Sequence, residues 1–238
     1  MKQIALLITI LCCFFYVNAQ QILENPAIAD RTHQDLTILR VGLYKDSTVI
    51  ELSIQNKLAQ GGWFCADRNI YIENPKDHKR FNLIKTRGIP TCPSVHNFLR
   101  IGEKLNFTLV FPKIPEETKL INLIEDCDKS CFRFTKVILD EKLSKDIKLY
   151  DQGVELYASN KINEAIDCFT KVVEVIPEFP TYVYGYSYFN LIRIFFNKGD
   201  KLTARYWYDQ LEKSHLADKD YFINSLKKEG IQVSSKFI

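Results

Sequence analysis

"GVELYASNKINEAIDCFTKVVEVIP", residues 153–177, repeats apolar residues at the spacing of an α-helix. Side chains three and four positions apart lie on one face of a helix, so this stretch predicts a helical region rather than a sheet. The same spacing begins upstream near Ser144, which we expect to cap the first helix, and it ends at Pro177, which cannot continue one. A helical domain is therefore expected over residues 144–230.

Five residues of this stretch form a recognisable pattern of small and large side chains. Gly153, Leu156, Ala165, Phe169 and Pro177 have the order and spacing that resembles a tetratricopeptide repeat (TPR). Small residues let two antiparallel helices approach closely, and the aromatic ring fills the space beside them. The resemblance implies a short stack of helix pairs whose first helices line a concave face.

A second copy of the pattern follows in "YFNLIRIFFNKGDKLTARYWYDQLEK", residues 188–213. Its members are Leu191, Ile192, Phe195, Ala204 and Tyr208. It departs from the family in two ways: Ile192 stands where a small residue is usual, and the copies are 39 positions apart, counted from Ala165 to Ala204, instead of about 34. The excess fits the Pro177–Pro180 connection. A last helix, "KDYFINSLKKEG" at 219–230, is expected to cover the open end of the stack.

Upstream of residue 140 the pattern changes to short strands. They are rich in β-branched and aromatic residues, are bounded by turn signals, and are expected at 35–44, 47–55, 63–72, 105–111 and 119–124. Many short strands at close spacing predict an antiparallel β-sandwich of immunoglobulin-like (Ig-like) type over residues 30–140. The expected fold class is thus α+β in two domains, with the boundary near 140–144.

The strand region also resembles a known module. "GGWFCADRNIYIENP" (61–75) and "GEKLNFTLVFPKIPEETKLINLIEDCDKSCFRF" (102–134) are similar to a β-sandwich module of secreted Bacteroidetes proteins. In that family the module precedes variable C-terminal domains, including thioredoxin-like ones. The resemblance implies a fold and an exported location, and it brings no catalytic residues with it.

The N-terminus has the features of a secretory signal peptide over residues 1–19. "MKQIALLITILCCFFYVNAQQ" has one lysine, an apolar run and small residues before the expected cleavage at Gln20, and Leu11 before Cys12 argues against lipidation. We expect the protein in the periplasm or at the cell exterior, without an integral membrane span. The 32 basic and 29 acidic residues leave a formal net charge of +3, which is too even to predict nucleic-acid binding.

Five cysteines remain after the signal peptide: Cys65, Cys92, Cys127, Cys131 and Cys168. In an oxidising compartment the first four predict two disulfides, Cys127–Cys131 across a three-residue hairpin loop and Cys65–Cys92 by elimination. A four-thiolate zinc site and a redox pair are the alternatives, but paired C-x-x-C knuckles are missing. Cys168, on a helix, is expected to be a buried free thiol.

No catalytic or cofactor-binding motif stands out. The four histidines are scattered, and the sequence has no nucleophile elbow, phosphate-binding glycine loop or H-E-x-x-H. We therefore expect no enzyme activity, no cofactor and no metal.

The resemblance to a TPR array predicts a partner-binding face on the first helix of each pair. Its residues are Tyr150, Val154, Tyr157, Tyr186, Phe189, Arg193, Phe196 and Asn197. Aromatic residues and arginine are common interface anchors, but the same side chains could instead pack against the β domain or the final helix. The expected function is non-catalytic binding of a protein or peptide. The alternatives are an accessory subunit of a cell-envelope enzyme or redox pathway, and carbohydrate binding through Trp63 and Phe64.

Overall fold

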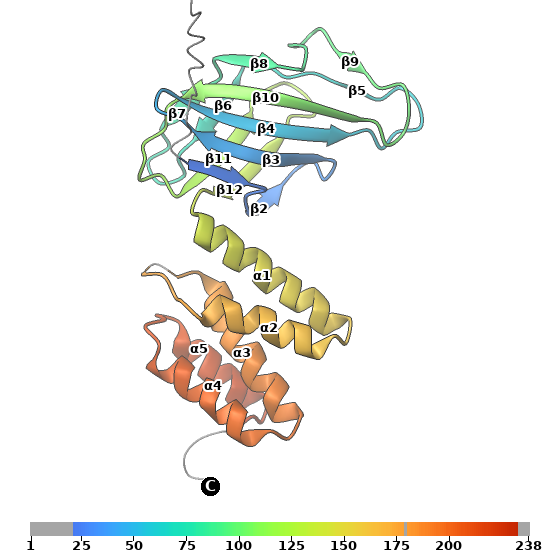
Figure 1. The fold of residues 1–238 in the computed structure, drawn as a ribbon. Coiled ribbons are helices and arrows are strands. Elements are labelled where there is room, and N and C mark those ends of the chain that lie inside the picture. Colours follow the sequence, from blue (N-terminus) through green and yellow to red (C-terminus); the bar gives the residue numbers. More distant parts are fainter. Residues whose placement is uncertain (1–20, 179, 233–238) are drawn as a thin grey trace, which may run out of the picture.

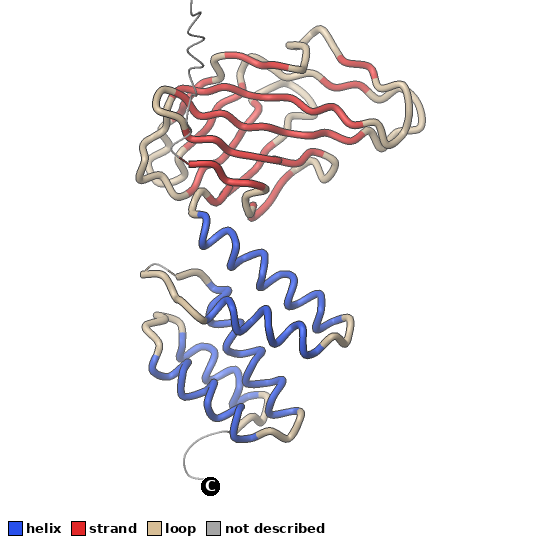
Figure 2. Tube along the Cα trace, viewed as in Figure 1, coloured by secondary structure: helices blue, strands red, loops and turns tan. Residues whose placement is uncertain are grey.

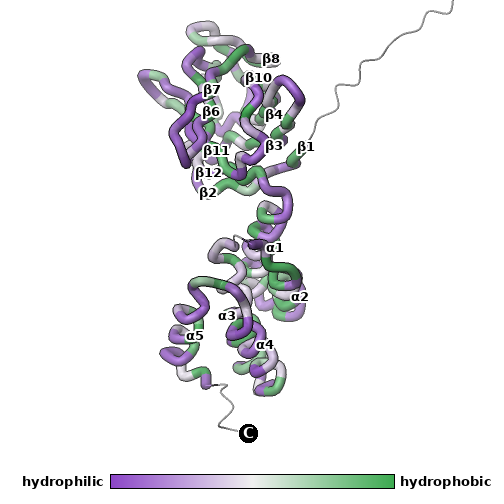
Figure 3. The backbone as a smooth tube through the Cα atoms, turned by 90° about the vertical axis from the view of Figure 1, so that its left-hand side faces the viewer, coloured by the Kyte–Doolittle hydropathy of each residue, from purple (hydrophilic) through white to green (hydrophobic). Residues whose placement is uncertain are grey.

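The computed structural model describes residues 21–178 and 180–232, so the expected signal peptide lies outside the described residues. The fold is α+β: antiparallel strands occupy the N-terminal part, and helices α1 to α5 follow (Figures 1 and 2). Seen from a second direction, the two parts are stacked end to end with α1 at the join (Figure 3).

The N-terminal part is built from two five-stranded antiparallel sheets. The first sheet runs in the order β1 (Gln21–Glu24), β3 (Leu36–Leu43), β4 (Ser47–Gln55), β10 (Lys104–Pro112) and β8 (Lys85–Arg87). The second runs in the order β2 (Ile28–Arg31), β12 (Arg133–Ile138), β11 (Leu120–Glu125), β6 (Ile70–Glu73) and β7 (Arg80–Asn82). A two-stranded ribbon of β5 (Trp63–Phe64) and β9 (His96–Asn97) extends from one end.

Alternating burial along the strands creates one shared core. In β4 every second side chain is buried, including Ile50 and Leu52, because successive side chains of a strand point to opposite faces. Ile72 of β6 and Leu123 of β11 belong to the same hydrophobic cluster, so the inner faces of both sheets meet in it. The two sheets therefore pack face to face as a sandwich.

The predicted cysteine pairing is confirmed. Cys65 and Cys92 form one disulfide with 5.3 Å between their α-carbons, and Cys127 and Cys131 form the other with 5.6 Å. Neither pair is therefore available as a set of zinc ligands. Cys168 is buried and free, as expected.

One predicted strand is wrong in its extent. Residues 63–72 were expected to form a single strand, but they divide into β5 and β6. Between them the Asp67 carboxylate accepts a hydrogen bond from the Asn69 amide at 2.8 Å, which is the geometry of an Asx turn. This local bond gives the backbone a turn in place of a continuous ladder.

The helical part contains α1 (Glu141–Ala158), α2 (Ile162–Val173), α3 (Tyr182–Asn197), α4 (Lys201–Lys213) and α5 (Lys219–Lys228). The predicted cap at Ser144 is wrong, because the side chain of Asp140 caps α1 by accepting the Leu143 amide. Ser144 is instead buried inside α1, where its hydroxyl oxygen accepts the Ala27 amide at 2.8 Å. Ser144 thus links α1 to the sandwich rather than starting the helix.

Close approach of the helices depends on two glycines. A β-carbon at Gly153 of α1 would lie 2.7 Å from the Phe169 ring of α2, and one at Gly185 of α3 would lie 2.0 Å from the Phe222 ring of α5. Both distances are too short for real carbon contacts, so each ring occupies the space that a side chain would need. A hydrogen bond adds to this packing, because the Tyr184 hydroxyl of α3 donates to the buried Asp146 carboxylate of α1 at 2.6 Å.

Within the part of the chain that the structure describes, none of the helices combines the length and apolar character needed to cross a bilayer.

Candidate functional site

A row of aromatic rings crosses helices α1, α3 and α5. Tyr150 of α1 lies 6.3 Å, between ring centroids, from both Tyr182 and Tyr186 of α3, and those two rings are 6.2 Å apart. Tyr186 in turn contacts Phe222 of α5 edge-on at 4.9 Å, and Tyr221 lies beside Phe222. The four tyrosines form one continuous surface beside the buried Phe222 ring, and we call this surface the tyrosine face.

Two tyrosines of this face, Tyr150 and Tyr186, have a pKa raised above the ordinary value of a tyrosine. Partial burial raises the pKa of Tyr150, with the neighbouring tyrosines adding to the effect. A hydrogen bond with the side chain of Tyr221 raises the pKa of Tyr186. The face therefore offers neutral hydroxyl groups that can donate as well as accept hydrogen bonds.

Arg193 of α3 connects the same three helices about two turns further along. Its guanidinium lies 5.5 Å from the ring centre of Tyr157 in α1 and 5.3 Å from that of Phe189. It donates to the Asn190 side chain at 3.1 Å and lies 3.9 Å from the Glu229 carboxylate after α5. Arg193 thus already contacts several partners, and these contacts connect α1, α3 and the end of α5.

The eight predicted partner residues fall into two groups. Tyr150 and Tyr186 contact each other in the tyrosine face, and Tyr157 and Phe189 each contact Arg193, although Phe189 is buried. Val154 and Asn197 are exposed, and Phe196 is partly buried against the helical core; no ring or hydrogen-bond contact connects these three to the others within residues 21–178 and 180–232. The structure therefore places five of the eight in two separate sets of contacts.

Two exposed tyrosines were missed by sequence reasoning. Tyr182 is 56% exposed and Tyr221 is 58% exposed, and they border the face on α3 and α5. Tyr182 precedes Tyr186 by four positions, which places both on one side of a helix and was a usable signal. Tyr221 could not be found in the same way, because its contribution depends on how α5 packs on α3 at Gly185.

The other aromatic residues of α3 serve packing. Tyr184 and Tyr188 are buried, and Tyr188 contacts Trp207 of α4 with 6.2 Å between ring centroids. One side of α3 thus belongs to the core of the helical part, while the side carrying Tyr182 and Tyr186 belongs to the tyrosine face. The packing interpretation is therefore confirmed for one side of α3, and the partner-binding interpretation stays a prediction for the other side.

A cavity in the sandwich, next to both disulfides, is a separate candidate site. This cavity of 520 Å³ is lined by Trp63, by three of the four paired cysteines (Cys65, Cys92 and Cys127) and by carboxylates that include Asp35, Asp67 and Asp128. Trp63 is 59% exposed, so its ring is open to solvent at the rim. Buried below it, Glu125 accepts hydrogen bonds from the Asp67 and Phe132 amides and holds the cavity floor.

Comparison with known proteins gives no family: no protein-family model matches this chain, and no curated protein sequence does either. Function has to be inferred from the geometry of the chain itself.

Proposed function

We propose that this protein is an exported, non-catalytic binding protein that holds a protein or peptide partner on its tyrosine face, in the periplasm or at the cell exterior. The observation that carries the proposal is the continuous row from Tyr182 through Tyr150 and Tyr186 to Tyr221, whose two ends are more than half exposed. Tyrosines combine large contact area with few rotatable bonds, which makes them effective anchors at interfaces.

The packing of the helices supports a TPR-like arrangement. Gly153 contacts Phe169 as the repeat pattern requires, and Ala165 and Ala204 are fully buried. Helices α1, α3 and α5 then take the place of the first helices that line the concave face. Ile192, where a small residue is usual, is also fully buried, so the second pair is accommodated by a different local packing.

The sandwich supports export. Two disulfides in a small β part are typical of proteins that fold in an oxidising compartment. We propose that this part is an Ig-like module of the secreted Bacteroidetes type and that it positions the helical part outside the cytoplasm.

Affinity capture tests the proposed function. The mature protein is compared with a double variant, Tyr182→Ala with Tyr221→Ala, and with the matched control Tyr206→Ala, whose ring on α4 is 54% exposed and lies off the tyrosine face. We expect partners captured from envelope extract by the wild type and by Tyr206→Ala to be lost from the double variant, with unchanged thermal stability. Equal capture by all three proteins would overturn the proposal.

The cavity beside the disulfides favours carbohydrate binding as a second candidate function. An exposed tryptophan ring next to carboxylates can stack on a sugar ring while the carboxylates accept its hydroxyl groups, and Trp63, Asp67 and Asp128 supply these groups. Glycan-array binding that disappears in Trp63→Ala would support it. The absence of any glycan binding by the wild type would remove it.

A further inference from the structure

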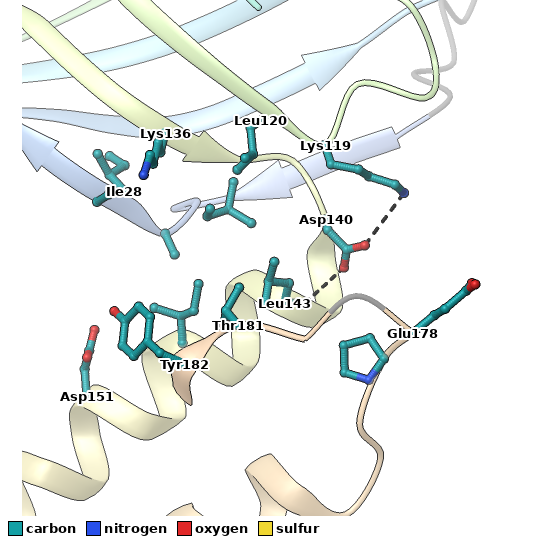
Figure 4. A pocket seen from close by; sticks show the side chains of 15 residues that line it. Ile28, Lys119, Leu120, Lys136, Asp140, Leu143, Asp151, Glu178, Thr181 and Tyr182 are labelled. Carbon is teal, nitrogen blue, oxygen red and sulfur yellow. Dashed lines mark hydrogen bonds and ion pairs between the residues drawn. The ribbon is translucent and has the colours of Figure 1, made fainter. Parts of the chain in front are cut away.

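A large cavity lies where the helical part meets the sandwich (Figure 4). Its volume is 860 Å³, which lies in the range of small-molecule sites, and its walls come from β2, β11, β12, α1 and the connection into α3. Much of the lining is apolar and includes Ile28, Leu120, Ile138, Leu143 and Ile147. The cavity is therefore suited to an apolar molecule.

One lysine is placed at this cavity by an irregularity in β12. Phe134 and Val137 both belong to the sandwich core although they are three positions apart, which a regular strand does not allow. The strand accommodates them through a shift in the register with β11, and Lys136 adopts a positive φ of 51° there, with its amide donating to Asn122. Such bulges redirect side chains, and Lys136 lies on the outer face, at the cavity (Figure 4).

The charge of Lys136 is uncompensated. Among the described residues, no carboxylate makes an ion pair with its ammonium group. The other cavity lysine, Lys119, already pairs with Asp140 at 3.7 Å, and Asp140 also caps α1. Two further carboxylates line the cavity: Glu178 points away from it, and Asp151 lies on α1 beside Tyr182 (Figure 4).

The side chain of Thr181 is a second polar group of the lining without a partner. The hydroxyl oxygen of Thr181 is buried and makes no hydrogen bond within the described part of the chain. Threonine at the start of a helix normally accepts a bond from the helix backbone, but Thr181 precedes α3 without doing so. A buried hydroxyl without a partner is costly, and a ligand in the cavity would satisfy it.

We propose that this cavity binds an apolar carboxylic acid, with the hydrocarbon body against Ile28, Leu143 and Ile147 and the carboxylate on Lys136. An ion pair beside an apolar wall is stronger than one in bulk water, so the unpaired ammonium group selects an anion. The hydroxyl of Thr181 donates a further hydrogen bond to the bound acid. This site adjoins the tyrosine face at Tyr182, which borders both, but it does not depend on the partner proposed there.

Calorimetric titration of the mature protein with decanoate tests the proposal. We expect saturable binding with one site per chain, weakened by roughly tenfold or more in Lys136→Asn, since a charge-assisted hydrogen bond is lost. Asparagine is chosen because it tolerates a positive φ. Lys85→Ala, on an exposed strand away from the cavity, is the matched control and should bind as the wild type does.

Two further measurements separate charge from shape. Decanol, which has no charge, should bind more weakly than decanoate and equally to the wild type and to Lys136→Asn. Ala29→Trp, which places a large ring in the cavity, should abolish binding of both molecules while thermal unfolding confirms that the protein is folded. Absence of decanoate binding by the wild type, or equal affinity in Lys136→Asn, would overturn the proposal.

Discussion

The sandwich and the helical part stabilise their hydrophobic cores in different ways. The sandwich combines hydrogen-bonded ladders with two disulfides, and its largest buried side chains meet between two extensive sheets. The helical part has no disulfide among its described residues, and its one cysteine, Cys168, is a buried thiol. It depends on glycines that admit aromatic rings and on a buried bond between Tyr184 and Asp146.

This difference determines where each part can carry a binding surface. The Cys65–Cys92 disulfide links the segments that flank the β5–β9 ribbon, and Phe64 of β5 packs against the sandwich core. The helices use many of their aromatic residues for packing, and the tyrosine face is exposed mainly at Tyr182 and Tyr221. Each tryptophan reports on one part, Trp63 on the sandwich and Trp207 on the helices, so both can be followed separately.

The largest effect is expected from Phe169→Ala. Removing a fully buried ring leaves a cavity beside Gly153 and should cost about 3–5 kcal/mol of unfolding free energy. Urea unfolding followed by Trp207 in a Trp63→Phe background measures the loss. The signal of Trp63 in the complementary Trp207→Phe background should shift far less, and equal shifts of both signals would show that the two parts do not differ as described.

Removing the Cys65–Cys92 disulfide should act on the other part. Its sequence separation of 27 residues corresponds to about 3.5 kcal/mol in the chain-entropy model, when both cysteines are replaced by alanine. The Trp63 transition should move to lower urea concentration while the Trp207 transition stays. Replacing Cys127 and Cys131, which are only four positions apart, should cost about 2 kcal/mol. A larger loss from the short loop than from the long one would contradict this ranking.

Tyr184→Phe tests the bond between α1 and α3. The change removes only the hydroxyl that donates to Asp146 and leaves a buried carboxylate with Lys142, at 2.7 Å, as its remaining partner. The expected cost is about 1.5–3 kcal/mol in the Trp207 transition. Tyr188→Phe is the control, since no hydrogen bond to the Tyr188 hydroxyl is found within the described part of the chain, and it should change stability little.

The smallest effect is a pH dependence in the sandwich. Burial raises the pKa of Glu125 above 4.5, although amide hydrogen bonds oppose the shift. A carboxyl whose pKa is higher in the folded state binds more protons when folded, so its contribution is greatest at low pH and falls as pH rises from 4.5 through the folded pKa. The unfolding free energy of the wild type minus that of Glu125→Gln should therefore decrease as the pH rises over that range. A difference that stays flat or increases would contradict the burial of this carboxyl.

Much of the fold could be predicted because local pattern and final packing agree. The strand expected at 47–55 is β4 with the same limits, since its alternation matches a half-buried strand. Short strands such as β2, β7 and β8 were missed because three or four residues carry too little periodicity to be recognised. Ser144 was mistaken for a cap because its bond to the Ala27 amide, 117 residues away in sequence, leaves no local signal.

The candidate sites were less predictable for the same reason. Helical spacing gave Tyr150 and Tyr186, because both lie on regular helices whose inner side follows from the pattern. The cavity at Lys136 could not be predicted, since it exists only where two distant segments and a bulge in β12 come together. Sites that one helix defines can be read locally, whereas sites between elements require the packed structure.

Hydroxyl-radical footprinting of the tyrosines tests the central claim most directly. In the isolated mature protein, Tyr182, Tyr221 and the control Tyr206 should all be modified, while Tyr184 and Tyr188 stay protected by burial. In the complex recovered from envelope extract, Tyr182 and Tyr221 should become protected and Tyr206 should not. Protection of Tyr182 and Tyr221 in the isolated protein, or equal protection of Tyr206 in the complex, would contradict a partner-binding face on α1, α3 and α5.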